Sequence, residues 1–180
     1  MTTNKKKNPV LNMVYAAMCL TLCMVLPFLT GQIPQVGSML SPMHIPVLLA
    51  GFLCGPWYAL AIGFIAPILR FVLFSMPPIF PVGIAMSFEL ATYGLVSGYM
   101  YKLLPKKNAN IYVALIVAML VGRVVWGTVY TIIAGVSEVT FSWAAFVAGA
   151  FVNAIPGIIL HIVLIPVLVM ALRKIKVIED

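Results

Sequence analysis

Long apolar runs, broken by proline, glycine and charged residues, dominate the hydrophobic pattern of this chain. Runs of roughly 17–25 apolar residues are long enough for an α-helix to cross the hydrocarbon core of a bilayer. The pattern therefore predicts an all-α membrane protein, with residues 1–180 forming a single transmembrane domain. The predicted helices cover residues 10–29, 44–55, 57–74, 82–104, 111–134 and 143–172.

The second run is short, so its junction with the third decides the number of spans. One long helix kinked at Gly55-Pro56 gives five spans, and two separate helices give six. Basic residues gather at the cytoplasmic ends of membrane helices. The flanking basic residues are Lys5, Lys6, Lys7, Lys102, Lys106, Lys107, Arg173, Lys174 and Lys176. Six spans place all of them on one side, so we predict a six-helix bundle with both termini in the cytoplasm.

The composition excludes a soluble globular domain. Of the 180 residues, 63% are hydrophobic and only 8% are charged, which is more apolar surface than a soluble core of this size can bury. The net charge of +7 comes mostly from the basic flanks and gives no reason to expect nucleic-acid binding. The three cysteines show neither a metal-ligand spacing nor a disulfide framework, so we expect them to be small packing residues.

Three charged side chains nevertheless lie inside the apolar runs: Arg70, Glu89 and Arg123. A charge at membrane depth is costly, so it usually faces the bundle interior or a polar cavity and marks a functional site. Glu89 can form a structural ion pair with either arginine, or it can contact a ligand. One acid against two arginines leaves a cation that an anionic or hydrogen-bond-accepting ligand can match. Arg70 can instead extend outward to the membrane surface.

Other polar and aromatic residues share faces with these charges. Arg123, Trp126 and Tyr130 lie on one helix face, and Glu89 and Tyr93 lie on another. In the last predicted helix, a ridge of small residues spaced by four also carries Asn153 and His161, which can either pack or line a cavity. Our candidate substrate-binding residues are His44, Arg70, Glu89, Tyr93, Arg123, Trp126, Tyr130 and Asn153.

Two loops on the predicted outer side, residues 30–46 and 75–81, are rich in proline and also carry apolar residues. A flexible linker would be rich in glycine and serine instead. Such stiff loops can cover an outward-facing pocket, although tight connections at the lipid boundary explain them equally well. The candidate gating residues are Gln32, Pro34, Met43, Met76, Pro78 and Phe80.

Several enzyme classes are excluded by missing motifs. The chain has no GxxxxGK[ST] phosphate loop, no HExxH and no GxSxG, and its only aspartate is Asp180. We therefore expect neither ATP hydrolysis nor an aspartate-based intramembrane protease or ion pump, and we expect no cofactor or metal.

In the first predicted helix, Ala17 and Thr21 are small residues one turn apart, which suits close contact with another helix, either in this bundle or in a partner.

Six short helices, cytoplasmic termini and the absence of an ATPase motif accompany a set of recognisable segments: 26–34, 43–51, 54–58, 76–81, 85–94 and 122–127. Over essentially its whole length the chain resembles the substrate-binding S components of energy-coupling factor (ECF) transporters. The resemblance implies a subunit of a prokaryotic plasma membrane that captures a vitamin or related micronutrient from outside. It further implies docking on a separate transmembrane coupling subunit that works with two cytoplasmic ATPase subunits.

The resemblance also implies roles for particular residues. The family's AxxxA docking motif corresponds to Ala17 and Thr21, with threonine in place of the second alanine. The family's gating loops correspond to residues 30–46 and 75–81. A small ligand that is polar and partly aromatic suits this set of side chains, so a pyridoxine-like or pyrimidine-like compound is favoured over pantothenate or a deazapurine queuosine precursor.

Two other function classes remain as alternatives. An autonomous secondary carrier or channel would need coupling-ion sites, and inverted repeats would support it. An intramembrane enzyme would need a nucleophile beside a base, and a non-transporting assembly factor would need neither.

Overall fold

The computed structural model describes residues 9–30, 33, 37, 39–136 and 155–178. These residues form α-helices and short helical turns and contain no strand. A 3₁₀ turn, η1 (Leu26–Thr30), extends the first helix, and a π-helical turn, η2 (Ile79–Gly83), precedes the fourth. The α-helices given in full by the described residues are α1 (Pro9–Val25), α3 (His44–Leu53), α4 (Pro56–Phe74), α5 (Ile84–Leu103), α6 (Asn108–Val136) and α8 (Ile155–Lys174).

Within the described part of the chain, five helical segments are long and apolar enough to cross a membrane: Pro9–Thr30, Pro56–Phe74, Ile79–Leu103, Asn108–Val136 and Ile155–Lys174. The helix α3 is shorter: it has only ten residues, or about 15 Å of helix, against about 30 Å of hydrocarbon. All but one of its residues are buried. It therefore lies inside the bundle, covered by its neighbours.

The junction at Gly55 separates α3 from α4. Gly55 has a φ of +89°, a backbone conformation that glycine adopts without strain, and Pro56 is the first residue of α4. The chain therefore forms two helices here, as the six-span interpretation requires. The predicted start of the last helix, at residue 143, lies outside the described residues.

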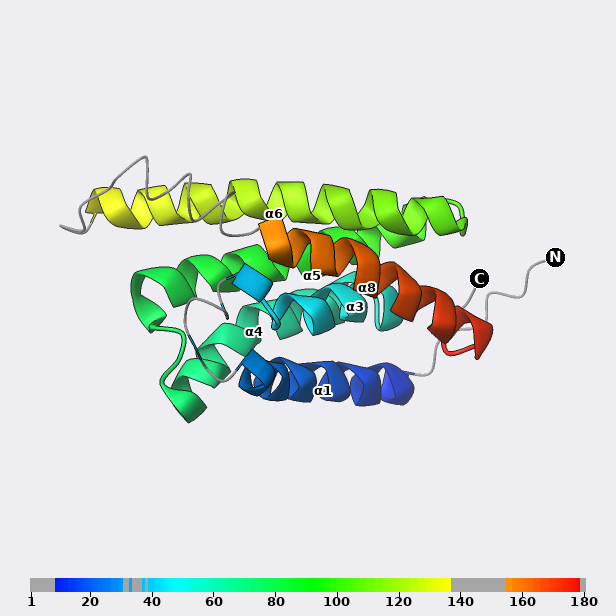
Figure 1. The fold of residues 1–180 in the computed structure, drawn as a ribbon, viewed down its shortest axis with the longest axis horizontal. Helices are drawn as coiled ribbons and strands as arrows, with labels where there is room; N and C mark the ends of the chain where they lie inside the picture. Colours follow the sequence, from blue (N-terminus) through cyan, green and yellow to red (C-terminus); the bar gives the residue numbers. More distant parts are fainter. Residues whose placement is uncertain (1–8, 31–32, 34–36, 38, 137–154, 179–180) are drawn as a thin grey trace.

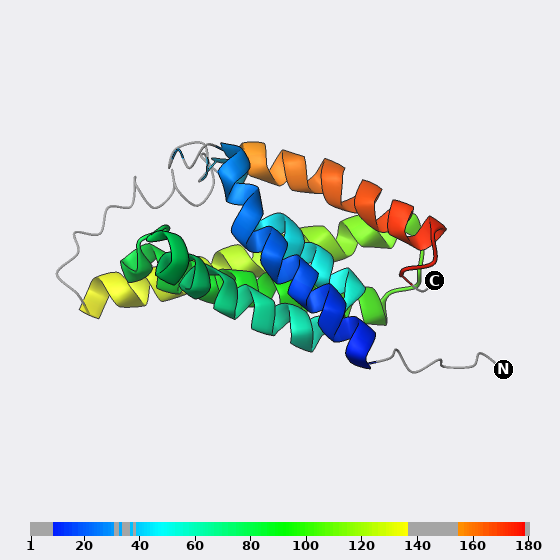
Figure 2. The same ribbon diagram turned by 90° about the horizontal axis from the view of Figure 1, so that it is seen from below.

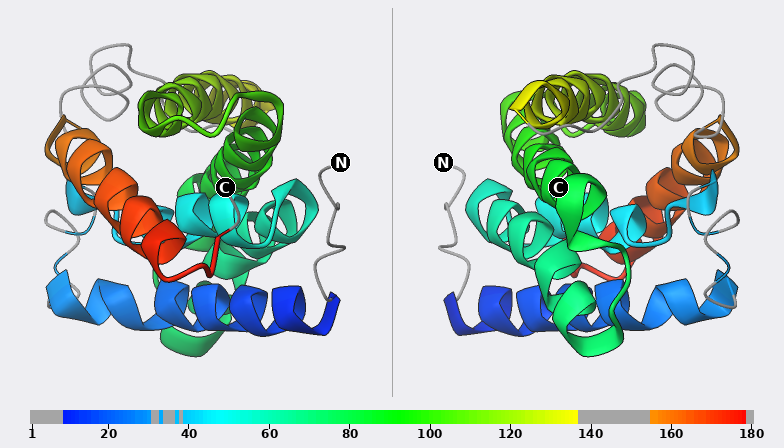
Figure 3. Two further views of the ribbon diagram at one scale, coloured as in Figure 1. Left: turned by 90° about the vertical axis from the view of Figure 1, so that its right-hand side faces the viewer. Right: turned by 90° about the vertical axis from the view of Figure 1, so that its left-hand side faces the viewer.

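α1 and α6 lie on opposite sides of the bundle, with α3, α4, α5 and α8 between them (Figures 1 and 3). α1 crosses over α3 and α4 (Figure 2), and it contacts both. α5 occupies the centre, where it contacts α3, α4 and α6.

Small residues bring α4 and α5 together. A Cβ atom on Gly94 would lie 2.4 Å from the carbonyl oxygen of Ala59, and one on Gly63 would lie 2.3 Å from that of Leu90. The two backbones are therefore in direct contact, which is how helices in lipid gain close packing.

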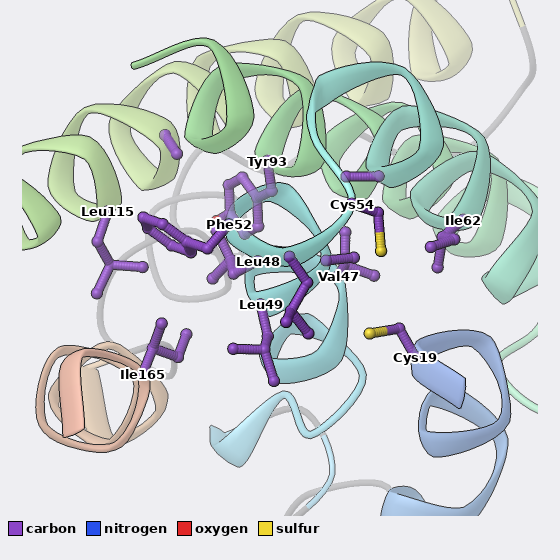
Figure 4. Close-up of a cluster of buried hydrophobic side chains, with 14 of the residues drawn as sticks. Cys19, Val47, Leu48, Leu49, Phe52, Cys54, Ile62, Tyr93, Leu115 and Ile165 are labelled. Carbon is purple, nitrogen blue, oxygen red and sulfur yellow. The ribbon is translucent and has the colours of Figure 1, made fainter. Parts of the chain in front are cut away.

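The core is built around α3 (Figure 4). Val47, Leu48 and Phe52 of α3 are buried against residues from the surrounding helices. These partners include Cys19 of α1, Tyr93 of α5, Leu115 of α6 and Ile165 of α8. Cys19, Cys23 and Cys54 form no disulfide and are buried in this core.

Candidate functional site

Glu89 lies at the centre of a group of buried polar side chains. Tyr93 Oη donates a hydrogen bond of 2.9 Å to Glu89 Oε1, and Arg123 Nη1 is 3.2 Å from the same oxygen. His44 Nε2 is 3.8 Å from Glu89 Oε2. The side chain of Glu89 is 3% exposed and that of Arg123 is 15% exposed, so the ion pair is largely shielded from solvent.

Four helices contribute to this group. Glu89 and Tyr93 are one turn apart on α5, Arg123 comes from α6, and His44 is the first residue of α3. The imidazole of His161, on α8, stacks on that of His44 with the ring centroids 5.9 Å apart and the planes at 15°. We call His44, Glu89, Tyr93, Arg123 and His161 the polar cluster.

Tyr93 fits beside α6 because the facing residue has no side chain. A Cβ atom on Gly122 would lie 2.1 Å from two carbons of the Tyr93 ring. Gly122 thus holds the phenol of Tyr93 next to Arg123, the following residue on α6. The ring of Tyr93 also meets that of His44 edge to face, with centroids 5.3 Å apart.

The polar cluster keeps unused hydrogen-bonding capacity. Within the described part of the chain, four of its buried nitrogens have no hydrogen-bond partner: His44 Nδ1, His44 Nε2, Arg123 Nε and His161 Nε2. A buried polar atom without a partner costs about 1–3 kcal/mol. A polar ligand that supplies partners to these atoms recovers that free energy on binding.

An aromatic pair continues from Arg123 along α6. The rings of Trp126 and Tyr130 stack with centroids 5.1 Å apart and planes at 19°. Both side chains are half-buried, on the same helix face as Arg123. Their ring faces can stack on a flat, partly aromatic ligand.

A second feature is a pocket of about 270 Å³ between the segments 27–43 and 76–86, which we call the loop pocket. Apolar side chains and prolines make up most of its wall. It is lined by Pro27, Thr30, Ile33, Gly37, Ser41, Pro42, Met43, Arg70, Met76, Pro77, Pro78, Val82 and Met86.

Arg70 is the charged residue in the wall of the loop pocket. Its Nη1 donates a hydrogen bond of 2.6 Å to the carbonyl oxygen of Met24, and its guanidinium carbon lies 5.2 Å and 5.1 Å from the ring centroids of Phe28 and Phe74. Cation–π contacts of this kind stabilise a buried cation. Arg70 is 3% exposed, and the only acid in the described residues, Glu89, pairs with Arg123 instead.

The structure thus divides the sequence-predicted site residues between two places. His44, Glu89, Tyr93 and Arg123 meet in the polar cluster, with Trp126 and Tyr130 alongside. Arg70, Met43, Met76 and Pro78 line the loop pocket. Phe80 is 49% exposed and does not line it. Gln32, Pro34 and Asn153 lie outside the described residues.

His161 is the cluster member that the sequence left undecided. Its position on a ridge of small residues was the available signal, because Gly157, one turn earlier, allows close packing. A Cβ atom on Gly157 would lie 2.6 Å from the carbonyl oxygen of Met39. Which of the ridge's polar residues would face His44 depends on how α8 docks, and sequence spacing does not contain that information.

The predicted docking residues lie on the outer surface of α1. Ala17 and Thr21 are both exposed, and Thr21 Oγ1 donates a hydrogen bond of 2.9 Å to the Ala17 carbonyl oxygen. The threonine hydroxyl is therefore satisfied within its own helix. The side chains that a partner helix would meet at Ala17 and Thr21 are therefore small, with no hydroxyl group left to satisfy.

Comparison with known proteins identifies one family. A sequence model described as "ECF transporter, substrate-specific component" matches residues 11–169, which is most of the chain. Searches of the curated proteins and of the solved structures gave no significant match. Among the described residues, no group of three or more histidine, cysteine, aspartate or glutamate side chains is arranged to hold a metal ion.

Proposed function

This chain belongs to the family of ECF transporter substrate-specific components, and from that premise we propose that it captures a small vitamin-like compound. A member of this family is a multi-pass membrane protein and a transport subunit, not an enzyme. The proposal adds the ligand class, the route by which the ligand enters and the surface that meets the coupling subunit.

The observation that carries the ligand class is the polar cluster, in which four buried nitrogens have no hydrogen-bond partner among the described residues. Because Glu89 and Arg123 neutralise each other, their ion pair has no net charge to offer an ion. The polar cluster offers directional hydrogen bonds instead, beside the stacked rings of Trp126 and Tyr130. A neutral, flat heterocycle with hydroxyl or amino groups suits this arrangement, and a pyridoxine-like or pyrimidine-like compound has that chemistry.

The loop pocket is the proposed entrance. Met43 of its wall directly precedes His44, and Met86 lies one turn before Glu89 on α5, so the pocket adjoins the polar cluster. We propose that α3 counts as a sixth membrane segment with both termini cytoplasmic, which places the loop pocket on the outer side. The loops at 30–46 and 75–81 then open and close over the ligand.

Arg70 supports a second ligand class, a monoanionic vitamin such as pantothenate. It is a buried cation without an acidic partner among the described residues, and it faces the loop pocket. A carboxylate could take up hydrogen bonds from its guanidinium while apolar groups contact the surrounding methionines and prolines.

Delivery requires the partners that the family uses. We propose that the surface around Ala17 and Thr21 docks on a transmembrane coupling subunit that works with two ATPase subunits in the prokaryotic plasma membrane. This chain would supply recognition, and the partners would supply energy.

Mass spectrometry of the small molecule retained on purification tests the ligand class directly. Titration of pyridoxine, a pyrimidine such as thymine or cytosine, and pantothenate into the stripped protein should then rank the candidates. Arg123→Met should weaken a neutral heterocycle by roughly tenfold to hundredfold, the effect of about 1.5–3 kcal/mol from a lost hydrogen bond to a charged group. Arg70→Gln should have the larger effect if the ligand is anionic.

Thr128→Val is the matched control, because Thr128 is exposed on α6 and its hydroxyl donates to the Val124 carbonyl oxygen of its own helix. If neither arginine variant changed the affinity for any retained compound, the proposed site would be contradicted. Binding of none of these compound classes would contradict the ligand class and leave the family assignment untouched.

A further inference from the structure

The end of the bundle opposite the loop pocket carries a second, strongly basic pocket. It has a volume of about 310 Å³ and lies where the turn between α5 and α6 meets the end of α8. Figure 2 shows the end of α8 beside this turn, and the left view of Figure 3 looks onto this end of the molecule. The pocket is lined by Lys106, Asn108, Met170, Arg173 and Lys174.

Arg173 is held in place by groups of the α5–α6 hairpin. Its Nε donates a hydrogen bond of 2.9 Å to Tyr101 Oη, and its Nη1 is 3.1 Å from the Lys106 carbonyl oxygen and 3.4 Å from Asn108 Oδ1. Lys106 Nζ in turn donates to the Tyr101 carbonyl oxygen and lies 3.6 Å from the centroid of the Tyr101 ring. The guanidinium is thus pre-oriented, at 9% exposure.

A buried donor and the start of a helix meet at this pocket. Arg173 Nη2 is buried and has no hydrogen-bond partner among the described residues. Asn108 begins α6 and lines the pocket, so the positive end of the helix dipole lies there. Both features suit oxygens that carry negative charge.

The described charged residues at this end are all basic. Lys102, Lys106, Lys107, Arg173, Lys174 and Lys176 gather at this end. The only acid in the described residues, Glu89, lies about four turns up α5 and is paired with Arg123.

We propose that this pocket binds a phosphate group, supplied by the headgroup of an anionic phospholipid or by phosphate in solution. Lys106 and Lys174 attract the group, and Arg173 and the first turn of α6 hold its oxygens. Membrane position favours the lipid source, because basic pockets between helix ends lie at headgroup depth. Exposed apolar residues at the same end, Leu103 and Ile175, offer contacts for acyl chains.

The test is binding of phosphatidylglycerol to the full-length protein in neutral detergent, followed by native mass spectrometry and by thermal unfolding. Phosphatidylcholine and inorganic phosphate are the comparison ligands. Lys174→Gln removes one charge from the pocket, and Lys102→Gln removes one from the same end, outside the pocket lining. Lys174→Gln should weaken phosphatidylglycerol binding about tenfold more than Lys102→Gln, the effect expected for one charge-assisted hydrogen bond.

Asn108→Asp is the second variant. A carboxylate at the start of α6 suits the helix dipole, so the lipid-free protein should unfold at the same or a higher temperature. The same carboxylate repels phosphate and supplies Arg173 with a counter-ion, so stabilisation by phosphatidylglycerol should disappear. A variant that had simply lost its fold would instead unfold earlier without lipid.

The outcomes separate the two sources. Stabilisation by phosphatidylglycerol but not by inorganic phosphate supports a lipid site, and stabilisation by both supports a phosphate site that also accepts a lipid. Equal weakening by Lys174→Gln and Lys102→Gln, or equal binding of phosphatidylcholine, would overturn the proposal in favour of a general basic surface. The double variant Glu179→Gln/Asp180→Asn tests whether the chain's own acids occupy the pocket. If it bound phosphatidylglycerol about tenfold or more tightly, those acids would be the anion that the pocket holds, and the proposal would be overturned.

Discussion

Removing the charge of Glu89 is the most informative perturbation of the polar cluster. Glu89→Gln keeps the shape of the side chain and an oxygen that can accept from Tyr93, but it leaves Arg123 without its counter-ion. Because Arg123 Nη1 and Glu89 Oε1 are only 3.2 Å apart, the variant should be less stable than the unchanged protein when both are measured without ligand.

The magnitude follows from burial. Breaking a buried ion pair by removing one partner costs about 3–5 kcal/mol. Because the Arg123 side chain is 15% exposed and can gain some hydration, the lower end, about 3 kcal/mol, applies here. At about 2–4 °C per kcal/mol for a chain of this size, the unfolding temperature should fall by roughly 6–12 °C.

The double variant Glu89→Gln/Arg123→Met tests whether the loss comes from the pair. With both charges removed, no buried ion remains uncompensated, so the double variant should lose at least 1 kcal/mol less than the two single variants together. Thermal unfolding of the four proteins in detergent, after removal of bound ligand, measures this coupling. Thr128→Val on the exposed side of α6 serves as the control.

Additive losses in the two single variants would refute the reasoning, because they would show that Glu89 and Arg123 do not interact energetically in the ligand-free protein. Ligand titration of the same proteins separates the two roles of the pair. Lower stability with unchanged affinity would assign the pair to holding the bundle together and would remove it from the proposed binding site.

Three further predictions concern packing, docking and topology. Gly94→Ala should lower the unfolding free energy by about 1–3 kcal/mol in denaturation measurements, since its Cβ would meet the backbone oxygen of Ala59 at 2.4 Å. Gly135→Ala is the control and should cause no loss, because a Cβ at Gly135 would have no atom within 4 Å. Ala17→Trp should abolish uptake in cells while the isolated protein still binds ligand, and loss of binding together with folding would instead assign Ala17 to packing. Cysteine-accessibility labelling should find residues 106–110 cytoplasmic, and outside labelling there would rule out the six-span topology.

Part of the site can be predicted from the sequence by helix geometry. Glu89 lies about four turns before the end of α5, and Arg123 lies about four turns after the start of α6. Two antiparallel helices joined by a short turn therefore hold these residues at the same depth. The sequence analysis placed both at membrane depth but left the partner of Glu89 open between Arg70 and Arg123.

Depth alone did not settle that choice, because Arg70 is also close to the end of its helix next to α5. The rotation of α4 about its axis turns Arg70 toward the carbonyl of Met24 and the rings of Phe28 and Phe74, away from Glu89. A helix's rotation is set by the packing of all its neighbours at once. Here the glycines at 63 and 94 fix how α4 meets α5.

The sequence by itself determined the properties that depend on local chemistry: helices long enough for a bilayer, the break at Gly55, and charges whose cost in lipid marks them as special. The family also followed from the sequence. Only the tertiary structure decided which side chains meet, because His44, Glu89, Arg123 and His161 come from four helices whose rotations no single segment specifies. The same reason explains why Arg173, read from the sequence as a topology signal, is found in a pocket with Tyr101 and Asn108.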